Sequence, residues 1–506
     1  MRKKTLGLDG SSLSIEDVVA VARNGVEAIL TPSARKQMLK SQAWVQRAMR
    51  DRSVVYGVTT GFGAFQNISI APEKLRELQR NLVLSHCAGV GDPFPEEVVR
   101  AMLLLRANAL AKGYSGIRVS TVERLLMMLN RQIHPVVPSK GSVGASGDLA
   151  PLSHMAAVLM GEGEAFHKGK RLPGREAMRR GGIDPVEFEA KEGIALNNGT
   201  QAMTAVGVLA LYDAELLADV ADIASAMSLE AVKGKSAPFA ARVHEIRPHP
   251  GQIVSARNVR NLIRGSQLVD RVDEDTRDKV QDSYSLRCVP QVHGASRDSI
   301  EHVRNVLTRE INSSTDNPLI YAAAEIAVNA GNFHGQPIAL AMDFLGLAIA
   351  ELGSISERRT AKLVDQHHNC GLPPFLAANG GVQSGLMIAQ YTAAALVSEN
   401  KVLIHPASGD SIPTSANQED HVSMGTIAAR HAREILGNVQ VVLAIELLCA
   451  AQALEYRRQR PGSGTRRAFE IIRAAVPRLD NDKILSDDIQ RISALVGSGE
   501  MREALR

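Results

Sequence analysis

The 506-residue chain has few cysteines, few aromatic residues and almost no charge imbalance. Its four cysteines are far apart and lack the paired spacing of a zinc site or a redox motif. We therefore expect reduced thiols in a cytoplasmic protein. The 58 basic and 54 acidic residues give a net charge of +4, and no block of like charge is long enough to indicate a nucleic-acid tail. This balance disfavours a dedicated nucleic-acid or membrane role.

Targeting and nucleotide-binding patterns are also missing. The basic residues 1–9 are followed by Glu16 rather than by an apolar stretch, so we expect no secretory signal. We expect no apolar run of membrane-spanning length either. The glycines at 141, 144 and 147 do not have the spacing of a phosphate-binding or dinucleotide-binding loop.

The sequence is rich in segments with helical periodicity. Residues 14–17 resemble a capping box, and a helix is expected to follow Pro95 and to run from Glu96 to Lys112. Segments rich in Ala, Leu, Ile and Met predict long buried helices near 201–232, 338–362, 387–403 and 424–456.

This pattern predicts a mainly α fold, an elongated bundle of long helices with a loop-rich N-terminal region. We divide the chain into that N-terminal region, 1–200, and a helical core with C-terminal helices, 201–506. One continuous domain is the alternative. The glycine and proline clusters lie between the helices, where we expect the chemistry.

Segment 141–154 contains the tripeptide Ala145-Ser146-Gly147, which can form an electrophile from its own backbone. Attack of the Gly147 nitrogen on the Ala145 carbonyl carbon, with loss of water, closes a five-membered imidazolone ring. Loss of a second water from Ser146 adds an exocyclic methylidene. Glycine offers an unhindered nitrogen and wide dihedral freedom, and alanine leaves the carbonyl uncrowded. Taken alone the tripeptide is more often an ordinary loop, so its surroundings decide.

Motifs spread over most of the chain resemble those of the ammonia-lyases and aminomutases that use a 4-methylideneimidazole-5-one group. They occur in order at residues 8–10, 56–63, 81–86, 145–147, 196–200, 281–287, 316–318, 331–334 and 415–421. The resemblance implies a mainly helical homotetramer with active sites shared between subunits. It also implies that Ala145-Ser146-Gly147 forms the prosthetic group, with no metal, pyridoxal phosphate or nucleotide.

The resemblance further implies roles for individual residues. Tyr56 matches the tyrosine proposed as the base that takes the substrate's β-proton, and nearby donors or positive charge would favour its phenolate form. Arg287 matches the arginine that holds the substrate carboxylate, a task that suits its planar fork. The residues that match those ordering the site or bordering the prosthetic group are Asn198, Gln281, Tyr284 and Phe333.

Two positions bear on the substrate. Ser85-His86 has the form found in histidine-specific members, and Glu419 lies where aromatic-specific members tend to carry glutamine. An imidazole ring offers both a donor and an acceptor, so His86 and Glu419 can both bond it. A phenyl ring would leave both groups unpaired, at roughly 1–3 kcal/mol for each neutral group. We expect elimination of ammonia from L-histidine to give trans-urocanate, with Tyr56 or Glu419 as the base.

Several alternatives stay open. The electrophile can be attacked by the substrate amine or by its imidazole ring. The chain can instead be a tyrosine or phenylalanine ammonia-lyase, or an aminomutase that returns ammonia to the β-carbon. A non-catalytic helical scaffold is a third class, which the presence of every reacting group disfavours.

Overall fold

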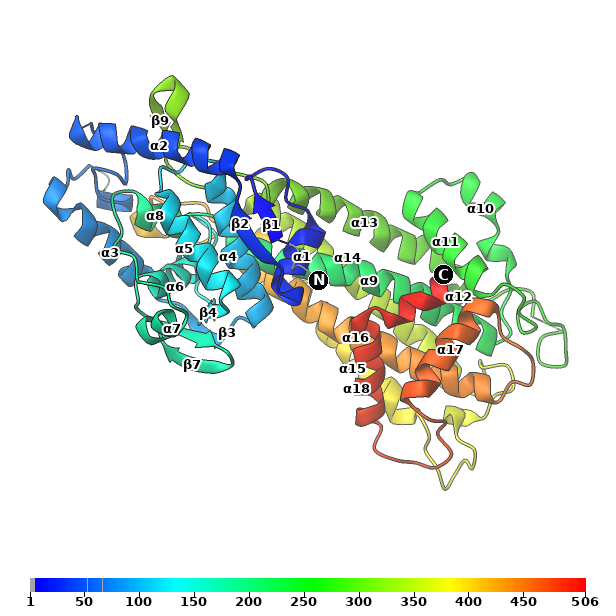
Figure 1. The fold of residues 1–506 in the computed structure, drawn as a ribbon. Helices are drawn as coiled ribbons and strands as arrows, with labels where there is room; N and C mark the ends of the chain where they lie inside the picture. Colours follow the sequence, from blue (N-terminus) through cyan, green and yellow to red (C-terminus); the bar gives the residue numbers. More distant parts are fainter. Residues whose placement is uncertain (1–4, 52, 66, 278) are drawn as a thin grey trace. The chain divides into compact units, whose positions relative to one another are not determined.

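The computed structural model describes residues 5–51, 53–65, 67–277 and 279–506. Helices dominate it and its strands are short (Figure 1), so the predicted mainly α fold class is confirmed. The chain divides into two compact units. The first comprises Met1–Tyr212, Arg304–Asp343 and Pro406–Arg430, and the second comprises Asp213–Val303, Phe344–His405 and His431–Arg506. The sequence-based division at residue 200 stays a prediction.

The first unit combines medium-length helices with small sheets. Strands β1 and β2 pair in parallel, while β3–β5, β4–β6–β7 and β8–β9 are antiparallel. Its helices are α1 (Ile15–Asn24), α2 (Pro32–Arg50), α3 (Leu75–His86), α4 (Glu96–Ala111), α5 (Val119–Asn130), α6 (Leu149–Leu159), α7 (Gly174–Arg180) and α8 (Glu192–Asn197). Its strands are β1 (Thr5–Leu8), β2 (Glu27–Leu30), β3 (Val90–Pro93), β4 (Ile133–Pro135), β5 (Pro138–Lys140), β6 (Glu164–His167), β7 (Lys170–Pro173), β8 (Leu319–Tyr321) and β9 (Ile326–Val328).

Local sequence explains where these helices begin. Ser14 caps α1 by accepting a hydrogen bond from the Asp17 amide, and the Asp17 carboxylate accepts one from the Ser14 amide, so the predicted capping box is confirmed. Helix α4 begins directly after Pro95, as predicted, and residues 98–111 are all buried. It therefore forms the centre of this unit's core.

Three helices of the first unit bring distant motifs together. Helices α3, α6 and α8 pack against one another (Figure 1). His86 is the last residue of α3, Asn198 directly follows α8, and the tripeptide loop leads into α6. Helix ends, rather than helix faces, thus carry the residues of interest.

Long helices account for much of the rest of the chain. The predicted long segments correspond to α9 (Gln201–Ala231), α14 (Gln336–Val364), α15 (Met387–Leu403) and α16 (Gly425–Glu455), and α13 (Val289–Glu310) is a further one. Helices α14 and α16 are long and apolar enough to span a membrane by length and composition, which corrects the expectation that no such run exists. Their most apolar windows are 61% and 72% buried within the protein, as in core helices.

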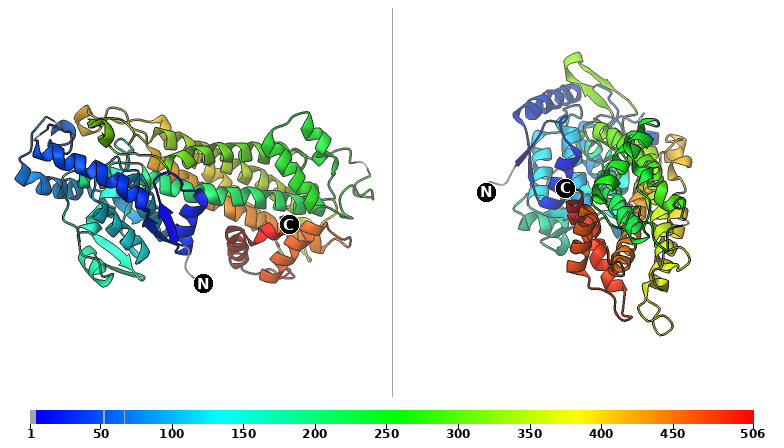
Figure 2. Two further views of the ribbon diagram at one scale, coloured as in Figure 1. Left: turned by 45° about the horizontal axis from the view of Figure 1, so that its top comes forward. Right: turned by 90° about the vertical axis from the view of Figure 1, so that its right-hand side faces the viewer.

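In the second unit the long helices lie side by side (Figures 1 and 2) and are joined by a buried polar network. The Arg359 guanidinium donates to both oxygens of Glu446, at 2.6 and 2.8 Å. His293 contacts Asp222 at 2.8 Å. These pairs link α14 to α16 and α13 to α9. The shorter helices of this unit are α10 (Ala241–Glu245), α11 (Pro250–Leu262), α12 (Tyr284–Arg287), α17 (Ser463–Ala475) and α18 (Ser486–Ser498).

Candidate active site

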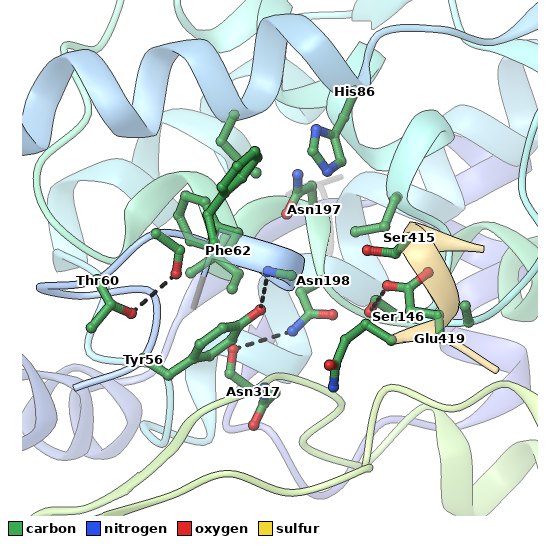
Figure 3. Close-up of a pocket in the computed structure, with 18 of the residues that line it drawn as sticks. Tyr56, Thr60, Phe62, His86, Ser146, Asn197, Asn198, Asn317, Ser415 and Glu419 are labelled. Atoms are coloured by element: carbon green, nitrogen blue, oxygen red, sulfur yellow. Dashed lines mark hydrogen bonds between the residues drawn. The ribbon is translucent and has the colours of Figure 1, made fainter. Parts of the chain in front are cut away.

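A cavity of about 1310 Å³ lies in the first unit, and every residue that lines it belongs to that unit (Figure 3). Helix ends and loops from five stretches of the chain surround it, namely 54–86, 145–149, 194–198, 317–334 and 415–421. It contains most of the residues that the sequence singled out. These are Tyr56, His86, Ala145, Ser146, Asn198, Phe333 and Glu419.

The tripeptide forms a tightly constrained turn at the wall of the cavity. Ala145 is buried against Val422 and Met424. Gly147 has φ +73° and forms a bridge with Gly199. A Cβ on Gly147 would lie 2.0 Å from the Gly199 carbonyl oxygen, so no other residue fits without moving the backbone. The turn is therefore held by main-chain contact.

A buried carboxylate ties this turn to the start of two helices. Asp148 accepts hydrogen bonds from the Ser142 hydroxyl at 2.8 Å, the Met203 amide at 2.8 Å and the Thr426 hydroxyl. Burial raises the pKa of Asp148, and these donors act in the opposite direction. Met203 lies in the first turn of α9 and Thr426 in that of α16. Asp148 thus fixes the loop that carries the tripeptide.

Ser146 and Glu419 both line the cavity and contact each other there. The Ser146 hydroxyl donates a 2.8 Å hydrogen bond to Oε1 of Glu419 (Figure 3). The two residues are 273 positions apart in the sequence. The hydroxyl that the predicted ring formation would remove therefore lies beside the carboxylate that we expect to contact the substrate.

Tyr56 lies in a glycine-rich loop and is partly buried. Its hydroxyl oxygen accepts a 3.2 Å hydrogen bond from the Gly63 amide (Figure 3). Phe62 packs edge-on against the ring, with centroids 6.3 Å apart. The Tyr56 side chain is therefore held by one main-chain hydrogen bond and one aromatic contact.

Asn198 offers an unused acceptor in the cavity. Its amide nitrogen donates to the Asn317 carbonyl oxygen at 3.2 Å. Its Oδ1 is buried and has no hydrogen-bond partner among the described residues. A buried polar atom without a partner is costly, so Oδ1 is available to bond a group in the cavity.

His86 is the last residue of α3, and its ring contacts the neighbouring Ser85. The Ser85 hydroxyl donates to the Leu82 carbonyl oxygen at 3.1 Å and also contacts Nδ1 of His86 at 3.1 Å. Because the single hydroxyl proton is used on Leu82, Nδ1–H of His86 donates in this contact and Nε2 remains an acceptor. Burial lowers the pKa of His86, which favours the neutral ring.

Three predicted site residues, Gln281, Tyr284 and Arg287, belong to the second unit and do not line the cavity. Tyr284 is 72% exposed, and the Arg287 guanidinium lies 4.6 Å from the centre of its ring. Nε of Arg287 is buried without a hydrogen-bond partner among the described residues. The roles assigned to these three residues stay predictions.

The cavity is also lined by polar residues to which sequence reasoning gave no role. His334 stacks on His421 with ring centroids 5.6 Å apart, and its Nε2 contacts the His421 carbonyl oxygen at 3.2 Å. The one sequence signal for these residues is their position inside the family motifs. Among these residues are Asn81, Asn317, His334, Gln418 and His421.

Comparisons with known proteins agree with this geometry. The family model described as aromatic amino acid lyase matches residues 13–474. A histidine ammonia-lyase of Caldanaerobacter subterraneus subsp. tengcongensis is 55% identical over 504 residues, covering 99% of this chain and 98% of that protein. A solved histidine ammonia-lyase from Trypanosoma cruzi is 41% identical with TM-score 0.92, covering 99% of this chain and 95% of that one. A tyrosine aminomutase from Streptomyces globisporus is 39% identical with TM-score 0.94, covering 99% and 98%. The chain therefore belongs to the aromatic amino acid lyase family.

Proposed function

We propose that this protein is a histidine ammonia-lyase, which eliminates ammonia from L-histidine to give trans-urocanate. The observation that carries the proposal is the 2.8 Å contact between Ser146 and Glu419 in a cavity that His86 also lines. It places a carboxylate suited to imidazole directly beside the reactive tripeptide. Relatives that are 52–55% identical over nearly the whole chain carry this name.

We also propose that Ala145, Ser146 and Gly147 form the 4-methylideneimidazole-5-one group. Three observations support the fit. Gly147 occupies a position that only glycine fits, Ser146 directs its hydroxyl into the cavity, and Asn198 presents an unpaired Oδ1. Once formed, the group would supply an uncharged electrophile that makes the substrate amine a better leaving group.

The residues around the cavity then have separate tasks. Glu419 accepts from one ring N–H of the substrate imidazole, and Nε2 of His86 accepts from the second ring N–H when that ring is protonated. Tyr56 takes the β-proton, and the Gly63 amide at 3.2 Å stabilises the negative oxygen. Glu419 is the alternative base, because its carboxylate also faces the substrate position. Phe333 closes the cavity with an apolar wall.

A homotetramer with shared active sites is the assembly that we propose. Gln281, Tyr284 and Arg287 would then come from a neighbouring subunit, where Arg287 would hold the substrate carboxylate as a bidentate partner. Large apolar side chains exposed at helical spacing on α14, with others on α15, support an assembled state, because large contiguous apolar surfaces mark interfaces between protein chains. These are Leu340, Phe344, Leu347, Ile388 and Tyr391. We propose a cytoplasmic location, which the four free cysteines support.

Intact mass and substrate turnover test this function together. Active protein should be lighter than its encoded mass by two waters, and Ser146→Ala should lack both the mass loss and the activity. Incubation with histidine should give the ultraviolet absorbance of urocanate, while tyrosine and phenylalanine should give no conjugated acid. Chromatography for a β-amino acid distinguishes an aminomutase. An unmodified mass in active protein, or turnover of tyrosine in preference to histidine, would overturn the proposal.

A further inference from the structure

The loop that carries Glu419 is closed on itself by main-chain hydrogen bonds. The Thr414 amide donates to the Glu419 carbonyl oxygen at 2.9 Å, and the Glu419 amide donates to the Thr414 carbonyl oxygen at 3.3 Å. The two residues therefore pair as an isolated antiparallel bridge. This pairing sets where the loop begins and ends.

The residues inside this loop have an unusual backbone. Ser415, Ala416 and Asn417 have φ of 52°, 54° and 67°, so three consecutive non-glycine residues are left-handed. Side chains disfavour this region, and such conformations persist where neighbouring contacts hold them. At the far end, His334 bonds the His421 carbonyl oxygen and the Ser411 hydroxyl accepts from the Val422 amide at 3.0 Å. The path of the loop is thus fixed independently of the Glu419 side chain.

The orientation of the Glu419 carboxylate depends on a different bond. The Thr414 hydroxyl donates to Oε2 at 2.9 Å, while the Ser146 hydroxyl donates to Oε1 at 2.8 Å. Ser146 loses its hydroxyl when the prosthetic group forms. After that loss, Thr414 is the one of these two donors that still bonds Glu419. Its hydroxyl keeps Oε2 occupied and Oε1 directed at the cavity.

We propose that Thr414 is a positioning residue for Glu419. It does not line the cavity and acts only through the carboxylate. The inference rests on the proposed function, in which Glu419 contacts the substrate. A hydrogen bond to a charged acceptor is among the stronger ones, so its loss should be measurable in turnover.

Thr414→Val removes the hydroxyl and keeps the shape, and Thr414→Ser keeps the hydroxyl and removes the methyl group. For histidine turnover we expect kcat/KM to fall by about tenfold or more in Thr414→Val and to stay within about twofold of wild type in Thr414→Ser. In a Glu419→Ala background, which has no side-chain acceptor for the Thr414 hydroxyl, Thr414→Val should change kcat/KM by less than about twofold, because the two residues act as one unit.

Equal losses in Thr414→Val and Thr414→Ser would show a packing role for the methyl group and overturn the proposal. A full effect of Thr414→Val in the Glu419→Ala background would overturn it as well. A crystal structure of Thr414→Val, or of Thr414→Ser if the valine variant does not fold, tests the geometry without activity. We expect a turned Glu419 carboxylate in the valine variant and the wild-type orientation in the serine variant, and any other result contradicts the proposal. Wild-type protein that fails to turn over histidine would sink the proposed function instead.

Discussion

Replacing Asp148 by alanine should destabilise the protein and prevent the tripeptide from maturing. The carboxylate is fully buried and accepts from Ser142, Met203 and Thr426. Alanine leaves these donors without their acceptor and frees the turn that precedes α6. Ring closure requires the Gly147 nitrogen close to the Ala145 carbonyl, so a loosened turn should not close.

The structure sets the size of the effect. The Met203 amide cannot turn away, so leaving it unpaired costs about 1–3 kcal/mol. The two hydroxyls can rotate toward other acceptors and should add about 1 kcal/mol together. Burial raises the pKa of Asp148, which shows that the buried charge itself is unfavourable, so its removal offsets part of the loss. We expect the free energy of unfolding to fall by about 2–3 kcal/mol.

Urea unfolding and intact mass measure the two consequences separately. Asp148→Asn is the matched control, because its carbonyl oxygen can still accept from Met203 and its amide can donate to a rotated hydroxyl. It should lose less than half as much stability as Asp148→Ala and should still mature. If Asp148→Ala unfolded at the wild-type urea concentration and showed the full loss of two waters, the reasoning about this carboxylate would be refuted.

Three further predictions concern glycine geometry, pH and a buried ion pair. Gly147→Ala should show no loss of water, and its free energy of unfolding should fall by more than that of Gly169→Ala. Gly169 has a similar φ of 76° but nothing within 4 Å of an added Cβ, so Gly169→Ala should lose only about 1–2 kcal/mol. Equal unfolding free energies for the two variants would contradict this. Burial lowers the pKa of His134 from 6.5 to about 4. The folded protein therefore favours the neutral ring, whose contribution to stability is present at pH 7 and is lost as the pH falls between these two pKa values. Between pH 7 and pH 5, wild-type protein should lose about 2 kcal/mol more than His134→Gln in urea unfolding, and parallel curves would exclude this. Lys191→Met should cost about 3–5 kcal/mol because it strands the buried Asp316 carboxylate, 2.6 Å away. Adding Asp316→Leu should recover most of that loss in the same assay, and no recovery would argue against the pair.

Most of the helical fold could be predicted from local signals. The capping box at Ser14, the start after Pro95 and the long apolar segments all act over a few turns of helix, and α15 begins and ends where periodicity indicated. The strands were not predicted because each has only three or four residues, too few to show an alternation of apolar and polar side chains. The division into two units depends on packing between distant segments, which no local pattern encodes.

The candidate site followed from motifs rather than from geometry. The motifs identified Tyr56, Ser146 and Glu419, and they indeed line one cavity. The support around them could not be foreseen, because the hydrogen bonds of Asp148 and Thr414 depend on backbone positions. Asp148 meets residues more than fifty positions away, and Thr414 acts across a left-handed turn that its sequence, without glycine, does not suggest.

Main-chain atoms make the contact between Gly147 and Gly199, so mutation of the side chains around the cavity leaves that contact intact. The position of the reactive tripeptide therefore does not depend on which side chains line the cavity. Under the proposed function, substitutions at His86 would change which ring the protein accepts without moving the turn from which the electrophile forms.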